Sequence, residues 1–102
     1  MTPKVILVDI DGCLTADTAW TSEDCLRAKP RLDVIEKVNE LYKENFIVLY
    51  TARRDHLIPA TLEWCRRNNV HFQAISNLKV GAEIYIDDRC VNVEDFLERG
   101  LP

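Results

Sequence analysis

The acidic residues of this chain gather at two places where an apolar run ends. Asp9 and Asp11 follow the run 5–8, and Asp87 and Asp88 follow a second run near the other end of the chain. Carboxylates brought together repel one another, and a cation offsets this repulsion. An all-oxygen site with few protein ligands suits Mg²⁺. The pattern therefore predicts a magnesium site that also binds a phosphate oxygen, so that an anionic carboxylate can approach an anionic substrate.

A hydroxyl and an ammonium group occur in positions that complete such a site. Thr51 ends another apolar run, and Lys79 lies in the segment that leads to the last one. Thr51 can donate a hydrogen bond to a phosphoryl oxygen, and Lys79 supplies a compact positive charge. A carboxylate nucleophile that forms an acyl phosphate needs these groups. Each signal is weak alone, because such a Thr is usually a local hydrogen-bonder and a single Lys is usually solvated. Their order at predicted strand ends favours the functional interpretation.

Apolar periodicity predicts the elements that position these residues. The predicted strands are 5–8, 46–50, 70–75 and 84–86. The predicted helices are 31–44, one that Asp55 caps and that ends at Asn68, and one that Asn92 caps and Gly100 ends. Residues 13–29 show no clear period and are predicted to form a loop, with at most a small hairpin or a short turn.

The alternation of strands and helices predicts one α/β domain over residues 1–102, a three-layer sandwich around a mostly parallel sheet. Right-handed crossovers place the carboxyl ends of parallel strands along one edge. Ligands bind at that edge in such sheets. The polar residues at the predicted strand ends should therefore converge on one site.

Composition and charge bound the function. The chain has 102 residues, enough for one compact domain, and its formal net charge is −4. A mildly acidic chain has no general attraction to nucleic acid or to an anionic membrane. There is no signal-peptide pattern and no apolar run long enough to cross a bilayer, so we expect a cytoplasmic protein. The four cysteines form no Cys-x-x-Cys pair, which favours reduced thiols over a zinc site or a disulfide framework.

Four segments resemble the motifs of the haloacid dehalogenase superfamily. Val-Asp-Ile-Asp-Gly-Cys-Leu-Thr at 8–15 is similar to the first motif, Asp-x-Asp-Gly-x-x-Thr. Leu-Tyr-Thr-Ala-Arg at 49–53 is similar to the second motif, and Lys79 fits the third. Ile-Tyr-Ile-Asp-Asp at 84–88 fits the acidic fourth motif. The four motifs run through nearly the whole chain.

The resemblance implies a role for each acidic residue. Asp9 would be the nucleophile and a metal ligand. Asp11 would be the general acid and base, and its backbone carbonyl would also bind Mg²⁺. Asp87 would be the second carboxylate ligand, and Asp88 would bind the metal through water or hold Lys79. Because family dehalogenases lack the second Asp of the first motif, Asp11 favours a phosphatase.

The resemblance also implies that Thr51 and Lys79 bind the phosphoryl group and that the sheet is Rossmann-like, with the order 3-2-1-4. Most members carry a cap domain, but 14–29 and 51–79 are too short to hold one. Capless members act on large substrates or borrow a lid from a neighbouring subunit, so a homo-oligomer is plausible here. The expected substrate is a sugar phosphate, a nucleotide or a phosphorylated nucleic-acid end.

Some assignments stay open at this point. Arg53 and Arg54 either meet a second anionic group of the substrate or are solvated near a helix start. Cys13 stands where Thr or Val is common, and we expect a steric role for it. Two other classes of function compete with a phosphatase. One is a catalytically silent binding or regulatory module, and the other is a receiver domain, which strand two disfavours because it ends in Thr51 rather than Asp.

Overall fold

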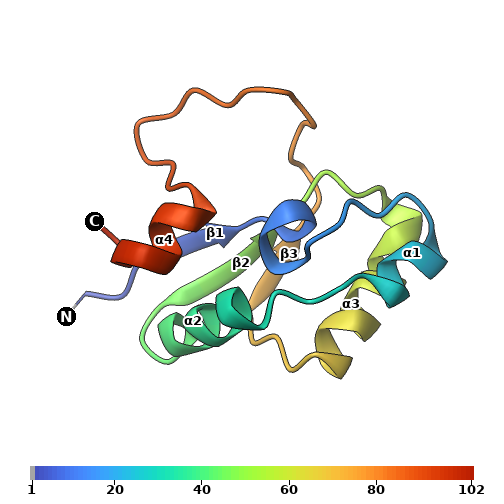
Figure 1. Ribbon diagram of the computed structural model, residues 1–102, viewed down its shortest axis with the longest axis horizontal. Helices are drawn as coiled ribbons and strands as arrows, with labels where there is room; N and C mark the ends of the chain where they lie inside the picture. Colours follow the sequence, from blue (N-terminus) through green and yellow to red (C-terminus); the bar gives the residue numbers. More distant parts are fainter. Residues whose placement is uncertain (1) are drawn as a thin grey trace.

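Three parallel strands form the sheet of this protein, which a computed structural model describes over residues 2–102 (Figure 1). The strands are β1 (Val5–Val8), β2 (Phe46–Tyr50) and β3 (Ala74–Ser76), in the order β1-β2-β3. Leu49 of β2 pairs with Val8 of β1. The predicted strands 5–8 and 46–50 are thus confirmed with their bounds, whereas the third strand begins four residues later than predicted.

The helices follow the predicted order with one addition. They are α1 (Ser22–Arg27), α2 (Leu32–Tyr42), α3 (Ile58–Arg67) and α4 (Val93–Arg99), with two short turns, η1 (Ile10–Leu14) and η2 (Asp55–Leu57). The helices predicted at 31–44 and after Asn92 are confirmed as α2 and α4. Among residues 2–102, no helix has the length and apolar character that a membrane crossing needs.

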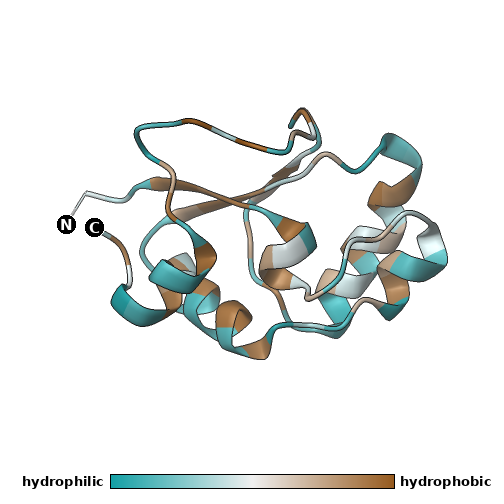
Figure 2. Ribbon diagram, turned by 45° about the horizontal axis from the view of Figure 1, so that its top comes forward, coloured by the Kyte–Doolittle hydropathy of each residue, from teal (hydrophilic) through white to brown (hydrophobic). Residues whose placement is uncertain are grey.

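The helices cover one face of the sheet, as Figure 2 shows. Ile47 and Leu49 of β2 are fully buried under them, whereas Val5 of β1 on the other face is 70% exposed. The chain steps from β1 to β2 to β3 in one direction, and right-handed crossovers then put both connecting helices on the same face. Residues 2–102 therefore form two layers, and the predicted three-layer sandwich is wrong for this part of the chain.

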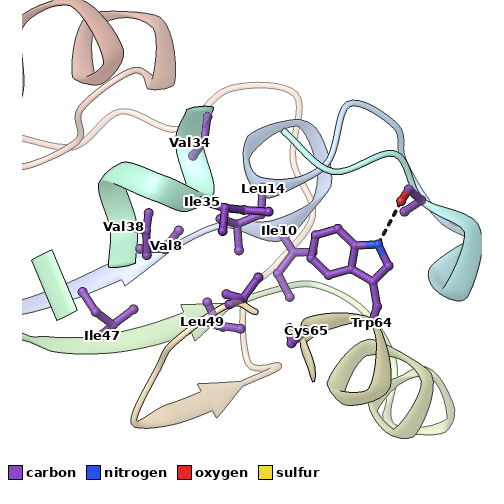
Figure 3. Packing of buried hydrophobic residues seen from close by; sticks show 12 residues of the cluster. Val8, Ile10, Leu14, Val34, Ile35, Val38, Ile47, Leu49, Trp64 and Cys65 are labelled. Carbon is purple, nitrogen blue, oxygen red and sulfur yellow. Dashed lines mark hydrogen bonds between the residues drawn. The ribbon is translucent and has the colours of Figure 1, made fainter. Parts of the chain in front are cut away.

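The hydrophobic core lies between the sheet and the helices (Figure 3). Val34 and Val38 of α2 pack into it from one helix, and Trp64 and Cys65 of α3 pack from another. The indole N–H of Trp64 donates to the carbonyl oxygen of Ala28 at 2.8 Å. Trp64 therefore joins α3 to the segment that precedes α2, and it satisfies its buried polar atom while doing so.

The predicted fourth strand, 84–86, is not a strand in the structure. This segment lies in the long connection between β3 and α4, and Ile86 is 97% exposed. The Tyr85 hydroxyl donates to the carbonyl of Val80 at 2.6 Å and accepts from the backbone N–H of Ala82 at 3.0 Å. These bonds hold the Tyr85 side chain against the backbone of residues 80 and 82 in a local turn.

Helix α1 lies inside the segment predicted as a loop. Its amino end is a capping box, in which the Thr21 hydroxyl accepts from the N–H of Asp24 at 3.1 Å and the Asp24 carboxylate accepts from the N–H of Thr21. The prediction that Asp55 caps the second helix is wrong. Asp55 instead opens η2, which precedes α3 without a side-chain cap.

Candidate active site

The Asp9 carboxylate stands directly after β1, at the carboxyl end of the sheet. Its Oδ1 accepts from the N–H of Ile10 at 2.8 Å, which fixes the carboxylate over the start of η1. Its Oδ2 lies 3.3 Å from the ammonium nitrogen of Lys79. The Asp9 side chain is 39% exposed. The group is therefore held at one oxygen by the backbone, while part of the side chain stays accessible to a substrate.

Lys79 reaches this carboxylate from the segment that follows β3. Its ammonium group lies 4.8 Å from the centre of the Tyr85 ring and 5.9 Å from that of the Tyr50 ring. A cation over an aromatic ring is attracted by the ring's quadrupole. The two tyrosines thus flank the charge of Lys79, which lies beside Asp9.

Asp11 is bound by a buried arginine from the other side of the site. Arg53 is 4% exposed, and its NH2 and Nε lie 2.7 Å and 3.1 Å from the two carboxylate oxygens of Asp11. Burial disfavours the charge of Arg53, but the hydrogen bonds to Asp11 and its negative charge outweigh this effect, so the pKa of Arg53 is raised. Gly12, at φ +79°, makes the turn that directs the chain away after Asp11.

Thr51 lies at the end of β2 and is fully buried. Its hydroxyl oxygen accepts from the N–H of Arg53 at 3.0 Å, and its own N–H donates to Ser76 of β3 at 2.9 Å. A threonine hydroxyl that accepts one bond still has its own hydrogen to donate. Asp9 and Asp11 at the end of β1, Thr51 at the end of β2 and Lys79 after β3 therefore share one edge of the sheet.

Cys13 packs beside this group as a neutral thiol. Burial, and then the negative charge of Asp9, raise the pKa of Cys13 to about 11, against smaller opposing effects of Arg31 and Lys79. At neutral pH the thiolate form is thus scarce, and the thiolate is the nucleophilic form of cysteine. The thiol fits the packing role expected for it.

The remaining predicted site residues lie apart from this cluster. Asp87 is exposed and accepts from the N–H of Arg89 at 2.8 Å, and the exposed Asp88 pairs with the same arginine at 3.8 Å. Arg54 is exposed and stands just before η2. Within residues 2–102, no three acidic, histidine or cysteine side chains gather where they could hold a metal. The metal-binding role of Asp87 stays a prediction.

Sequence reasoning missed three residues that shape the site. Thr61 of α3 accepts from NH1 of Arg53 at 2.9 Å, and Tyr50 and Tyr85 flank Lys79. The sequence carries no local signal for these contacts, because each joins residues that only the fold brings together. Thr61, at a helical spacing from the apolar residues of α3, is indistinguishable in the sequence from an ordinary core position.

Comparison with known structures places the fold. An MCSG target from Vibrio cholerae, solved as a crystal structure, is 31% identical to this chain, with a TM-score of 0.81. The match covers 92% of this chain and 87% of that one. The chain belongs to the same family as this Vibrio cholerae protein. The relationship extends over nearly the whole domain.

A second similarity supports the fold alone. A chain from the Pnkp1/Rnl/Hen1 complex is 16% identical, with a TM-score of 0.59. The match covers 95% of this chain and 34% of that one, so the present domain corresponds to about a third of the larger chain. No protein-family model matches the sequence, and no curated protein matches it.

Proposed function

We propose that this protein is a Mg²⁺-dependent phosphomonoester hydrolase, a capless member of the haloacid dehalogenase superfamily, with Asp9 as its nucleophile. The observation that carries the proposal is the accessible Asp9 carboxylate at 3.3 Å from Lys79, with Asp11 two residues further on. A cation beside a carboxylate at a sheet edge suits an anionic substrate that the carboxylate attacks.

The proposed reaction has two steps. An oxygen of Asp9 attacks phosphorus, and the bond from phosphorus to the ester oxygen breaks while Asp11, which enters this step as the protonated acid, gives its proton to that oxygen. Water then attacks the phosphorus of phospho-Asp9, Asp11 takes the proton from the water, and phosphate and the Asp9 carboxylate are released. Lys79 and the hydroxyl of Thr51 bind the phosphoryl oxygens. Because Thr51 is buried, its contact with a substrate requires a small local movement.

The donor chemistry of the site suits magnesium. The Asp9 carboxylate and the backbone carbonyl of Asp11 are oxygen donors at one edge, and oxygen is the donor that Mg²⁺ prefers. The ion would neutralise phosphoryl oxygens and bring substrate and carboxylate together. The site also requires a second carboxylate ligand, which Asp87 would supply, and Asp88 would bind the metal through water or hold Lys79. Both residues lie outside the cluster in the structure.

We propose that residues 84–86 add a fourth strand to the free edge of β1, giving the order 3-2-1-4. The strand would place the second carboxylate, that of Asp87, at the site. β1 pairs with β2 on one side, and Val5 and Leu7 of β1 are exposed, as are Ile84 and Ile86. Burying these apolar side chains against each other favours the pairing. A parallel strand at this edge ends beside β1, and it would therefore bring Asp87 toward Asp9.

Hydrogen exchange tests the fourth strand. With Mg²⁺ present, the amides that face β1, either those of Ile84 and Ile86 or that of Tyr85 between them, should exchange about 10²-fold or more slowly than in an unfolded chain, because ladder hydrogen bonds protect them. The amide of Gly81, in the connection outside the strand, is the internal control and should stay fast. Exchange of all three amides, of Ile84, Tyr85 and Ile86, at the unfolded rate would contradict the strand.

Phosphate release tests the function. The purified protein should hydrolyse p-nitrophenyl phosphate with Mg²⁺, and EDTA should reduce the rate at least about 10²-fold because the ion offsets the charge between carboxylate and phosphate. Excess Mg²⁺ should restore it. The same assay over sugar phosphates, nucleotides and 3′-phosphorylated oligonucleotides then identifies the substrate class. Mg²⁺ binding without turnover across this panel would favour the alternative, a catalytically silent binding or regulatory module.

A further inference from the structure

The Asp11 carboxylate accepts hydrogen bonds from three N–H groups, and these bonds are unequally divided between its two oxygens. Oδ1 accepts from NH2 of Arg53 at 2.7 Å and from the N–H of Ala19 at 3.1 Å. Oδ2 accepts from Nε of Arg53 at 3.1 Å. A carboxylate oxygen has about two lone-pair sites. Both sites of Oδ1 are therefore occupied, and one site of Oδ2 is open.

Arg53 is itself fixed by a neighbour on α3. Its NH1 donates to the hydroxyl of Thr61 at 2.9 Å, and that hydroxyl donates to the carbonyl of Leu57 at 2.8 Å. Thr61 is fully buried, as is the Arg53 side chain apart from a small fraction. A planar guanidinium that is held at three nitrogens has one orientation, and its fork sets the plane of the carboxylate that it binds.

We propose that Arg53, held by Thr61, is a positioning residue that fixes the plane of the Asp11 carboxylate and makes Oδ2 the atom that transfers the proton. This inference rests on the proposed phosphatase function. In this role Arg53 acts on Asp11 and does not contact the substrate. A residue that is 4% exposed and bound at three nitrogens has little surface left to bind a second anionic group of the substrate. The exposed Arg54 is the better candidate for that contact.

If Arg53 positions Asp11, the loss of Arg53 should change how the rate depends on the basicity of the leaving group. A proton from Asp11 matters most when the departing oxygen is basic, and it matters little for an acidic phenol that leaves as an anion. A misplaced Asp11 should therefore slow the cleavage of basic leaving groups selectively. The ratio kcat/KM reports on the cleavage of the ester bond, because it covers the reaction up to the first irreversible step, the release of the leaving group.

The experiment measures kcat/KM for a series of aryl phosphates with graded leaving-group acidity. Arg53→Lys keeps the charge and loses the fork, and it should reduce kcat/KM about 10²-fold for the most basic phenol and less than about threefold for p-nitrophenol. The plot of rate against leaving-group acidity thus becomes steeper. Thr61→Val, which keeps the shape and loses the hydroxyl, should steepen it in the same sense but less. Thr61→Ser keeps the hydroxyl and should follow the wild type.

The outcomes separate the two proposals. An equal loss for every phenol in both Arg53→Lys and Thr61→Val, with an unchanged slope, would show that the network only supports the fold and would overturn the positioning role. A wild-type protein that hydrolyses no aryl phosphate would instead overturn the phosphatase function. Circular dichroism and urea unfolding establish that each variant is folded. If Arg53→Lys does not fold, the slope measured for Thr61→Val decides alone.

Discussion

Replacing Asp9 by Asn is expected to reduce phosphate release by at least about 10³-fold, because the amide cannot attack phosphorus as a carboxylate does. The change keeps the size of the side chain and its hydrogen bond from Ile10, which needs only an oxygen acceptor. It removes the charge that faces Lys79. The measurement is steady-state turnover of p-nitrophenyl phosphate with saturating Mg²⁺.

The matched control for this variant is Asp17→Asn. Asp17 lies in the same region of the chain, is exposed, and contributes its backbone carbonyl, rather than its carboxylate, to the hydrogen bond with Thr15. The control makes the same change of charge and should keep wild-type turnover. Because the Asn in Asp9→Asn can deamidate back to Asp, the variant Asp9→Ala is also measured. Wild-type turnover in Asp9→Ala would contradict the assignment of the nucleophile.

Replacing Trp64 by Ala is expected to lower the free energy of unfolding by about 4 kcal/mol. Trp64 is the largest fully buried side chain, and its loss opens a cavity between α3 and the sheet. The carbonyl of Ala28 also loses the indole donor that satisfies it. This is a large fraction of the stability of a small domain. Urea unfolding followed by fluorescence and circular dichroism gives the value.

Leu62→Ala is the control on the same helix. Leu62 is 40% exposed, so its truncation should cost about 1 kcal/mol or less. Trp64→Phe separates the two parts of the larger loss, because it keeps most of the apolar volume and removes the indole N–H. A cost for Trp64→Ala no greater than that of Leu62→Ala would show that this core is not what stabilises the domain.

The elements predicted best from the sequence are those whose apolar period and ends can be identified within the element itself. The helix at 31–44 and the strand at 46–50 have a clear apolar period and clear ends, and the structure has them as α2 and β2. Helix α1 has six residues and no apolar stripe to reveal it. Its amino-terminal signal is the pair Thr21 and Asp24, in which Asp takes the place that Glu or Gln holds in the usual capping box.

The layers of the sandwich and the partners inside the site depend on contacts between distant segments. An apolar run such as 84–86 has the composition of a strand, but its sequence does not specify whether β1 pairs with it or a local turn through Tyr85 holds it. The bond between Asp11 and Arg53 joins residues 42 apart. The sequence named both residues as candidates, yet only the fold reveals that one holds the other.

The central claim, that Asp9 carries the phosphoryl group during turnover, is tested most directly by trapping that intermediate. The protein is mixed with substrate and Mg²⁺, quenched in acid within the first turnovers, and examined by intact and peptide mass spectrometry. We predict the added mass of one phosphoryl group on the peptide that contains Asp9, removed by hydroxylamine and missing in Asp9→Ala. Rapid phosphate release by the wild type, with the label on another residue or with no labelled protein at any quench time, would contradict it.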